Sequence, residues 1–195
     1  MKKLIKAVIF LAVIATIVYG GAIGYGKLTR FLYPMKYSEY VEKYSNEFDV
    51  PESLVYAVIK CESSFDPNAE SHAGAKGLMQ MLPEAFEWSK SRYKGDSGGD
   101  ILDPETNIKF GTYILRLHYD TFGDWQEAVA AYHAGAGNVK AWLKNSQYSS
   151  DGKTITKFPD SCADTERYVK KVFGAQEKYI ELYFSENIER TDNNG

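Results

Sequence analysis

Cysteine and histidine are scarce in this sequence: its 195 residues include two cysteines and three histidines. Cys61 and Cys162 can form at most one disulfide, and the sequence leaves open whether they pair or stay separate thiols, because it does not show whether their Cα atoms approach within bonding distance. His72, His118 and His133 lack the spacing of a metal-binding motif, and no phosphate-binding loop is present. We therefore expect no metal and no nucleotide cofactor.

A surplus of basic side chains is also missing, since 23 Lys and Arg stand against 26 Asp and Glu. Lys2, Lys3 and Lys6 precede the first apolar run, so the remaining chain has 20 basic and 26 acidic side chains. A protein that follows a phosphate backbone needs a basic stripe on its surface. The charge balance therefore argues against nucleic acid as a partner.

One long uncharged stretch, residues 7–26, follows the three N-terminal lysines. As a helix, these twenty residues are long enough to cross the core of a bilayer. We expect residues 1–26 to be an uncleaved transmembrane signal-anchor in the cell membrane, with the lysines in the cytoplasm and the rest of the chain extracytoplasmic. The alternative is a cleaved signal peptide, which would leave a secreted protein.

The rest of the chain has the pattern of one all-α domain. We expect residues 27–37 to be a juxtamembrane linker, residues 38–185 the folded domain and residues 186–195 a polar tail. Apolar residues at helical spacing and N-terminal Ser, Asp or Pro residues predict about seven helices. They are expected at 38–48 with Ser38 as N-cap, 51–62, 83–93, 104–122, 124–134 with Asp124 as N-cap, 138–144, and from a cap at Asp164 or Thr165 onward.

Glu62 has an unusual position at the end of an expected helix. The apolar run from Leu54 to Ile59 leads to it, and the segment Phe65–Pro67 breaks the helix just after it. A helix C-terminus carries partial negative charge and apolar neighbours remove water, so both effects raise the pKa of a carboxyl group. Glu62 is therefore a candidate proton donor.

Three separated segments, 62–71, 74–80 and 131–139, combine small residues with one or two polar side chains. Together with residues 164–169, they resemble the lysozyme-like catalytic domain of the soluble lytic transglycosylase (SLT) family. That family has a Glu-Ser pair, a Gly-Leu-Met-Gln loop, an Ala-Ala-Tyr-Asn-Ala-Gly segment and a last helix entered through Glu-Thr and Tyr-Val. The resemblance covers residues 38–183 and implies a goose-type helical domain with a cleft.

The resemblance also implies roles for seven residues. Glu62 matches the single catalytic acid of the family. Six others match positions that hold the substrate or the acid: Ser63, Ser71, Gln80, Tyr132, His133 and Tyr168. Simpler interpretations stay open for several of them, since Ser63 and Gln80 can satisfy local backbone groups and both tyrosines can belong to the core.

The sequence departs from the family pattern at three positions. His133 replaces an asparagine, Asp164 replaces a glutamate, and Leu82 stands where methionine is common. An imidazole can donate a hydrogen bond to an N-acetyl carbonyl, but its charge changes near neutral pH, which an amide's does not. We therefore expect His133 to affect how the substrate is held.

A second carboxylate is missing from the matching motifs. Most glycosidases use two carboxyl groups, whereas Asp66 and Glu70 belong to no matching motif and Asp66 before Pro67 is typical of a turn. The resemblance implies that the chain cleaves the β-1,4 bond between N-acetylmuramic acid and N-acetylglucosamine in peptidoglycan glycan strands. Glu62 would serve as acid and then as base, which leaves a 1,6-anhydromuramyl end.

Two other functions remain open. The same fold can support a lysozyme-type muramidase, a hydrolase whose products have ordinary reducing ends. The domain can also be a non-catalytic glycan-binding component of an envelope machine, although Glu62 argues against this.

Overall fold

The computed structural model describes residues 14, 16, 19–21 and 24–185, and it divides the chain into two compact units with a boundary between Pro34 and Met35. In the first unit, residues 24–32 are helical. Most of the transmembrane helix expected over residues 1–26 lies outside the described residues. Within the part of the chain that can be described, no helix is long and apolar enough to cross a membrane.

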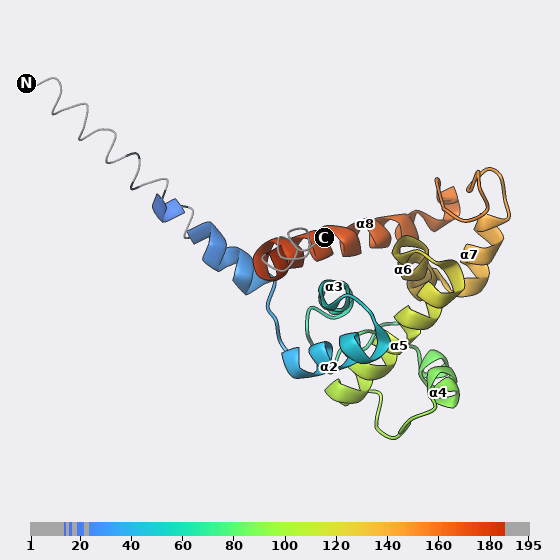
Figure 1. Cartoon of the computed structure of the whole chain (residues 1–195), viewed down its shortest axis with the longest axis horizontal. Helices are drawn as coiled ribbons and strands as arrows, with labels where there is room; N and C mark the ends of the chain where they lie inside the picture. The colour runs from blue at the N-terminus through green and yellow to red at the C-terminus, as the bar shows by residue number, and fades with distance from the viewer. Residues whose placement is uncertain (1–13, 15, 17–18, 22–23, 186–195) are drawn as a thin grey trace, which may run out of the picture. The chain divides into compact units, whose positions relative to one another are not determined.

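The second unit is built from helices (Figure 1). They are α2 (Ser38–Phe48), α3 (Glu52–Glu62), α4 (Pro83–Arg92), α5 (Pro104–Phe122), α6 (Trp125–Ala134), α7 (Ala136–Leu143), the 3-10 turn η1 (Asp160–Cys162), α8 (Ala163–Tyr179) and the π-helical turn η2 (Ile180–Phe184). Residues 35–185 form no β-strand, and two isolated bridges join Lys76 to Glu70 and to Met81. The all-α expectation is confirmed.

Two of the expected helix caps are wrong. Ser38 is the first residue of α2, and Tyr37 precedes it as N-cap because the Tyr37 carbonyl accepts the first helical hydrogen bonds, from the amides of residues 40 and 41. At α8, Cys162 is the N-cap, since the η1 turn has already wound the chain before Asp164 and Thr165. Asp124 does cap α6, because its side chain accepts a hydrogen bond from the amide of residue 126.

Helix α3 is the centre of the core. Residues 54–59 have no exposed surface, so every face of the helix is covered, and each large apolar side chain buried in this way contributes about 1.5–3 kcal/mol. α3 packs against α8 and α2, while α5 packs against α2 and α6. Figure 1 shows α3 nearly end-on between α8 and α2. The ring of Tyr56 on α3 stacks on Tyr179 of α8, with 5.2 Å between centroids. Glu62, at the C-terminus of α3, is therefore held by the most buried element of the domain.

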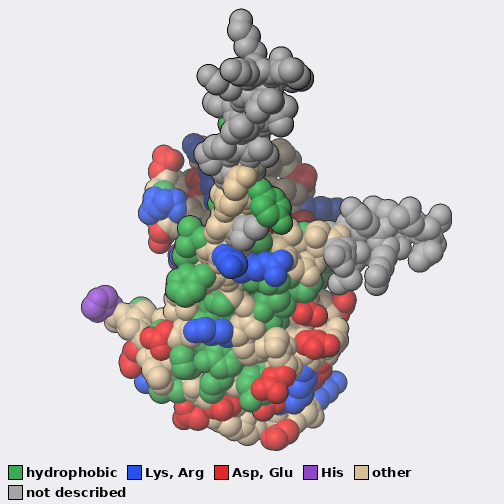
Figure 2. Space-filling view, turned by 90° about the vertical axis from the view of Figure 1, so that its left-hand side faces the viewer, with side chains coloured by type: hydrophobic (Ala, Val, Ile, Leu, Met, Phe, Trp, Pro, Cys, Tyr) green, Lys and Arg blue, Asp and Glu red, His purple; other side chains and the backbone are tan. Residues whose placement is uncertain are grey.

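Charged and hydrophobic side chains share the surface of the domain. On the face seen in Figure 2, Asp and Glu side chains and Lys and Arg side chains lie among hydrophobic areas. Among the described residues, ion pairs such as Arg116–Asp49 and Lys43–Glu105 join some of these charges. Surface pairs of this kind contribute little stability, about 0–1 kcal/mol each. The core therefore provides most of the stability that positions the site.

Both cysteines are free thiols in the structure. Burial raises the pKa of the Cys61 thiol to about 11, so the reactive thiolate is a minor form at neutral pH. The structure therefore answers the open question about Cys61 and Cys162: it contains no disulfide between them.

Candidate active site

A cavity of about 830 Å³ opens beside the C-terminus of α3. Its walls come from the end of α3, the loop 71–82, and helices α4, α5, α6 and α7. Five of the seven predicted site residues line it: Glu62, Ser71, Gln80, Tyr132 and His133. The other two, Ser63 and Tyr168, are not among the lining residues. Tyr168 contacts Glu62, and Ser63 contacts the carbonyl of Leu78 in the following loop. Residues from four distant parts of the sequence thus meet around Glu62.

The environment of Glu62 favours its protonated form. Burial raises its pKa to about 7, while the hydrogen bond from Tyr168 and the positive charge of Lys171 act in the opposite direction. The Tyr168 hydroxyl lies 2.5 Å from Glu62 Oε1, and a donor at this position stabilises the ionised carboxylate. At neutral pH both forms of Glu62 are populated, which suits a group that first donates and then accepts a proton. The direction expected from the sequence is confirmed, and burial is its main cause.

His133 and Tyr168 form a stacked pair beside Glu62. Their ring centroids are 4.5 Å apart and their planes differ by 26°. The Nδ1 atom of His133 lies 3.1 Å from Thr165 Oγ1 at the start of α8, so one nitrogen of the imidazole is occupied by the protein. Burial lowers the pKa of His133, although Asp164 acts against this shift. His133 is therefore mainly neutral at pH 7, because its pKa lies below the ordinary 6.5.

Ser63 joins the end of α3 to the loop that follows. Its hydroxyl donates a hydrogen bond to the carbonyl of Leu78 at 2.8 Å and accepts one from the amide of Phe65 at 3.1 Å. These contacts satisfy backbone groups, and Ser63 is not among the residues that line the cavity. Its predicted contact with the substrate stays a prediction, and the geometry supports a role in fixing the position of Glu62.

The loop that faces Glu62 is held by Gln80 and by a residue that the sequence did not single out. Gln80 Nε2 donates to the carbonyls of Ala69 and Gly77, each at 2.9 Å. Asn107, fully buried on α5, accepts from the amide of Met79 at 2.7 Å and donates to two further carbonyls. A Cβ atom at Gly77, whose φ is +79°, would overlap the Asn107 side chain. The sequence signal for this role was a polar residue, Asn107, within the apolar stripe of the expected helix 104–122.

Tyr132 and Ser71 complete the described wall near Glu62. The Tyr132 hydroxyl donates to the carbonyl of Met79 at 2.8 Å, so α6 is also tied to the loop. Ser71 Oγ accepts from the amide of Ala75 at 3.1 Å in a turn at the cavity edge. Both side chains are therefore held by backbone partners, and their contacts with the substrate stay predictions.

Four further residues on the cavity wall were not predicted: Trp88 and Arg92 on α4, His118 on α5 and Lys140 on α7. The Arg92 guanidinium lies over the Trp88 ring, 4.6 Å from its centroid, and 41% of Trp88 is exposed. Burial and the charge of Lys140 lower the pKa of His118 to about 4. The sequence placed Trp88 and His118 in expected helices but did not predict that they line a cavity, because helical spacing does not show which face of a helix meets a cleft.

Among the described residues that line the cavity, Glu62 is the sole carboxylic acid. The Asp66 carboxylate accepts a hydrogen bond from the amide of Asn68 at 2.9 Å, as expected for a turn. Glu70 lies 3.7 Å from Lys76 Nζ. Neither acid is among the described residues that line the cavity.

Helices around a cavity, with a partly buried glutamate at the end of one helix, agree with the lysozyme-like domain expected from the sequence. The family model for the transglycosylase SLT domain matches residues 39–155. The chain therefore belongs to this family.

Comparisons with known proteins agree with this assignment. The chain is 34% identical over 152 residues to the soluble lytic murein transglycosylase of Escherichia coli, which covers 75% of this chain and 23% of that protein. It is 31% identical over 166 residues to the membrane-bound lytic murein transglycosylase C of Salmonella typhimurium, which covers 74% of this chain and 46% of that protein. The crystal structure of the 70 kDa soluble lytic transglycosylase from Escherichia coli matches with a TM-score of 0.66 and 30% identity, over 79% of this chain and 25% of that chain.

The lysozyme-like fold expected from the sequence is confirmed by this structural match. The chain spans less than half the length of the curated relatives it matches.

Proposed function

We propose that this chain is a peptidoglycan lytic transglycosylase that uses Glu62 as its single acid and base. The observation that carries the proposal is the cavity in which Glu62, with a pKa raised to about 7, is the sole acid among the described lining residues. Membership of the SLT family and the names of its relatives support the same activity. The substrate is the β-1,4 bond between N-acetylmuramic acid and N-acetylglucosamine in a glycan strand.

Glu62 takes part in two proton transfers. In the first, the protonated carboxyl group donates its proton to the glycosidic oxygen, and the bond from that oxygen to C1 of the muramic acid residue breaks. The acetamido group of the substrate stabilises the electron-poor C1. In the second, the Glu62 carboxylate removes the proton of the C6 hydroxyl, and the C6 oxygen forms a bond to C1. No water is consumed, the product is a 1,6-anhydro ring, and Glu62 returns to its protonated form.

The other predicted residues hold the acid or the strand. Tyr168 keeps the Glu62 carboxyl in place and stabilises its ionised form, while Ser63 and Gln80 keep the loop against the end of α3. Tyr132, Ser71 and His133 face the cavity and contact the sugar. The neutral His133 imidazole takes the place of the family's asparagine amide as a hydrogen-bonding group.

We further propose that the chain is tethered to the cell membrane by residues 1–26, with the domain extracytoplasmic. The support is the uncharged stretch after Lys2, Lys3 and Lys6, and the name of one relative is consistent with a membrane-bound enzyme. Fractionation of expressing cells separates the two alternatives. An anchored protein stays with membranes after a high-salt wash, whereas a cleaved one is released and loses its N-terminal residues.

The activity is tested by digesting purified peptidoglycan with the wild-type chain and analysing the products by mass spectrometry. We expect 1,6-anhydromuramyl ends, each lighter by one water than the hydrolysis product. Hydrated reducing ends alone would instead identify a muramidase. Glu62→Gln should abolish cleavage, while Glu70→Gln, which alters an acid outside the cavity, should retain it. If Glu62→Gln keeps the full biological function of the protein, the domain is a binding module.

A further inference from the structure

A second cavity, of about 610 Å³, lies on another part of the domain. It is formed by the α2–α3 junction, the end of α5, the start of α6, and the turn η2, and it shares no lining residue with the cavity around Glu62. Its size is within the roughly 300–1,000 Å³ range of small-molecule sites. None of the roles assigned to the catalytic cavity involves this region.

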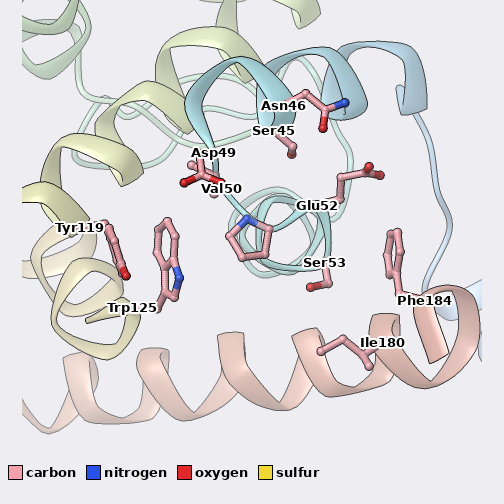
Figure 3. A pocket seen from close by; sticks show the side chains of 11 residues that line it. Ser45, Asn46, Asp49, Val50, Glu52, Ser53, Tyr119, Trp125, Ile180 and Phe184 are labelled. Carbon is pink, nitrogen blue, oxygen red and sulfur yellow. The ribbon is translucent and has the colours of Figure 1, made fainter. Parts of the chain in front are cut away.

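One wall of this cavity is a rigid aromatic stack. The ring of Trp125 lies on the ring of Tyr119, with centroids 4.2 Å apart and planes at 26°, and the Arg116 guanidinium carbon lies 5.5 Å from the Tyr119 centroid. Figure 3 shows Trp125 and Tyr119 side by side at this cavity. The Tyr119 ring covers one face of the indole, and both rings line the cavity. Aromatic surface of this kind suits the C–H face of a sugar ring.

Hydroxyl groups stand beside this aromatic wall. Ser53 Oγ accepts a hydrogen bond from Gln176 Nε2 at 3.3 Å, which leaves its own proton free for another acceptor. Ser45 is 3% exposed and its Oγ has no partner among the described residues. In Figure 3 the side chains of Ser45 and Ser53 extend from α2 and α3 at this cavity. The Ser45 Oγ atom is enclosed by the protein, so Ser53 is the hydroxyl of this pair that is suited to a polar ligand.

Two acidic side chains, Asp49 and Glu52, also line the cavity. Asp49 is paired with Arg116, with 2.9 Å between Oδ2 and the guanidinium nitrogen. Burial and the neighbouring Glu42 raise the pKa of Glu52. A polyhydroxylated ligand would find the acceptor oxygens of these side chains and the hydroxyl of Ser53 in the same cavity. The far wall, with Phe184, adds apolar surface.

We propose that this second cavity binds a saccharide unit of the glycan strand, with the sugar stacked on Trp125 and its hydroxyl groups bonded to the polar wall. The choice of ligand rests on the proposed function, since the substrate of a lytic transglycosylase is a polysaccharide that extends well beyond one cleft. A second contact with the same material keeps the enzyme on the polymer between cleavage events.

The three tryptophans of the chain make a direct test practicable. Trp125 lines the second cavity, Trp88 lines the catalytic cavity and Trp142 is buried in the core. The indole N–H signals of the full-length Glu62→Gln chain are followed by NMR while a β-1,4-linked tetramer of N-acetylglucosamine is added. We expect the signals of Trp125 and Trp88 to shift and saturate on separate binding curves, while the Trp142 signal stays in place.

A matched pair of variants locates the effect. Phe184→Ala removes the far wall and should weaken the Trp125 binding curve at least about 3-fold, with the Trp88 curve unchanged. Glu181→Ala alters an exposed side chain of the same turn that does not line the cavity, and it should change neither curve.

Three results would overturn the second site. One is a stationary Trp125 signal at saccharide concentrations that saturate Trp88, which leaves the proposed catalytic function standing. Another is a Trp125 curve that follows the Trp88 curve in every variant, which would indicate coupling to the catalytic cavity. The third is a shift of Trp125 by a lysine-rich peptide but not by the saccharide, which would indicate a cation site. The digestion assay on the wild-type chain tests the catalytic function independently.

Discussion

The hydroxyl of Tyr168 on α8 donates a 2.5 Å hydrogen bond to Glu62 at the end of α3, across 106 positions of the sequence. Burial keeps the pKa of Tyr168 well above its ordinary value, so the phenol remains protonated and remains a donor throughout the working pH range. Tyr168 therefore limits how far burial raises the pKa of Glu62. Variants that remove this hydrogen bond, the Glu62 carboxyl group, or the side chains of His133 or Asn107 should therefore change the activity, its pH dependence or the stability of the domain.

Tyr168→Phe should move the basic limb of the pH–rate profile to higher pH. The lost hydrogen bond stabilised the ionised form of Glu62, so its pKa rises by about one unit, the size expected for one charge-assisted bond. The measurement is kcat/KM for peptidoglycan fragments as a function of pH. Tyr113→Phe, which removes a hydroxyl that bonds to the carbonyl of Arg92 and not to Glu62, is the control and should leave the limb in place. A shift to lower pH would show that the hydroxyl favours the protonated acid.

Glu62→Gln should make the domain more stable at high pH while it removes activity. The pKa of Glu62 is raised from 4.5 to about 7 in the folded state, so ionisation destabilises the folded wild type as pH rises through this window. The full effect is about 3 kcal/mol, at 1.36 kcal/mol for each unit of pKa. Glutamine does not ionise and avoids this loss.

Urea unfolding of both proteins at about pH 5 and about pH 8 measures this difference in free energy. The free energy of unfolding of Glu62→Gln minus that of the wild type should be larger at the higher pH, by about a few kcal/mol at most. A difference that is the same at both values would mean that the Glu62 pKa is not raised by folding.

His133→Asn should leave activity at neutral pH within about threefold of the wild type, because the imidazole is already mainly neutral there. The two proteins should differ on the acid limb, since His133 gains a proton only below its ordinary pKa of 6.5. Asparagine has no such transition, so the variant's profile should be flatter in acid. The comparison uses kcat/KM from neutral to acidic pH, and a folded but inactive variant at neutral pH would give His133 a catalytic role of its own.

Asn107→Leu should destabilise the domain by about 3 kcal/mol or more, because it leaves the backbone partners of the buried amide without hydrogen bonds. The loop that carries Gln80 should loosen and activity should fall with it. Thermal unfolding and the digestion assay measure the two effects. Asn138→Leu, at an exposed position on α7 whose amide bonds only within its own chain segment, should cost less than about 1 kcal/mol. Equal losses in the two variants would contradict the role of Asn107.

Local pattern was enough to predict the helices and the position of Glu62. Apolar spacing and the residues at the ends of α3, α5 and α6 act within one or two turns, so their consequences could be worked out from the sequence. The caps at Ser38 and Asp164 or Thr165 were wrong, because the neighbouring turns decide which residue takes the cap. The domain boundaries and the roles of the site residues in the substrate complex stay predictions.

The sequence by itself determined an all-α domain, a carboxyl group at the end of a buried helix, and the family to which its motifs belong. Tertiary structure alone decided that Tyr168 contacts Glu62, that Asn107 holds the loop that carries Gln80, that the cysteines are unpaired, and that Trp125 lines a second cavity. These contacts join residues distant in the chain, and their geometry depends on how whole helices pack. Helical periodicity specifies which residues share a face, but packing determines what that face meets.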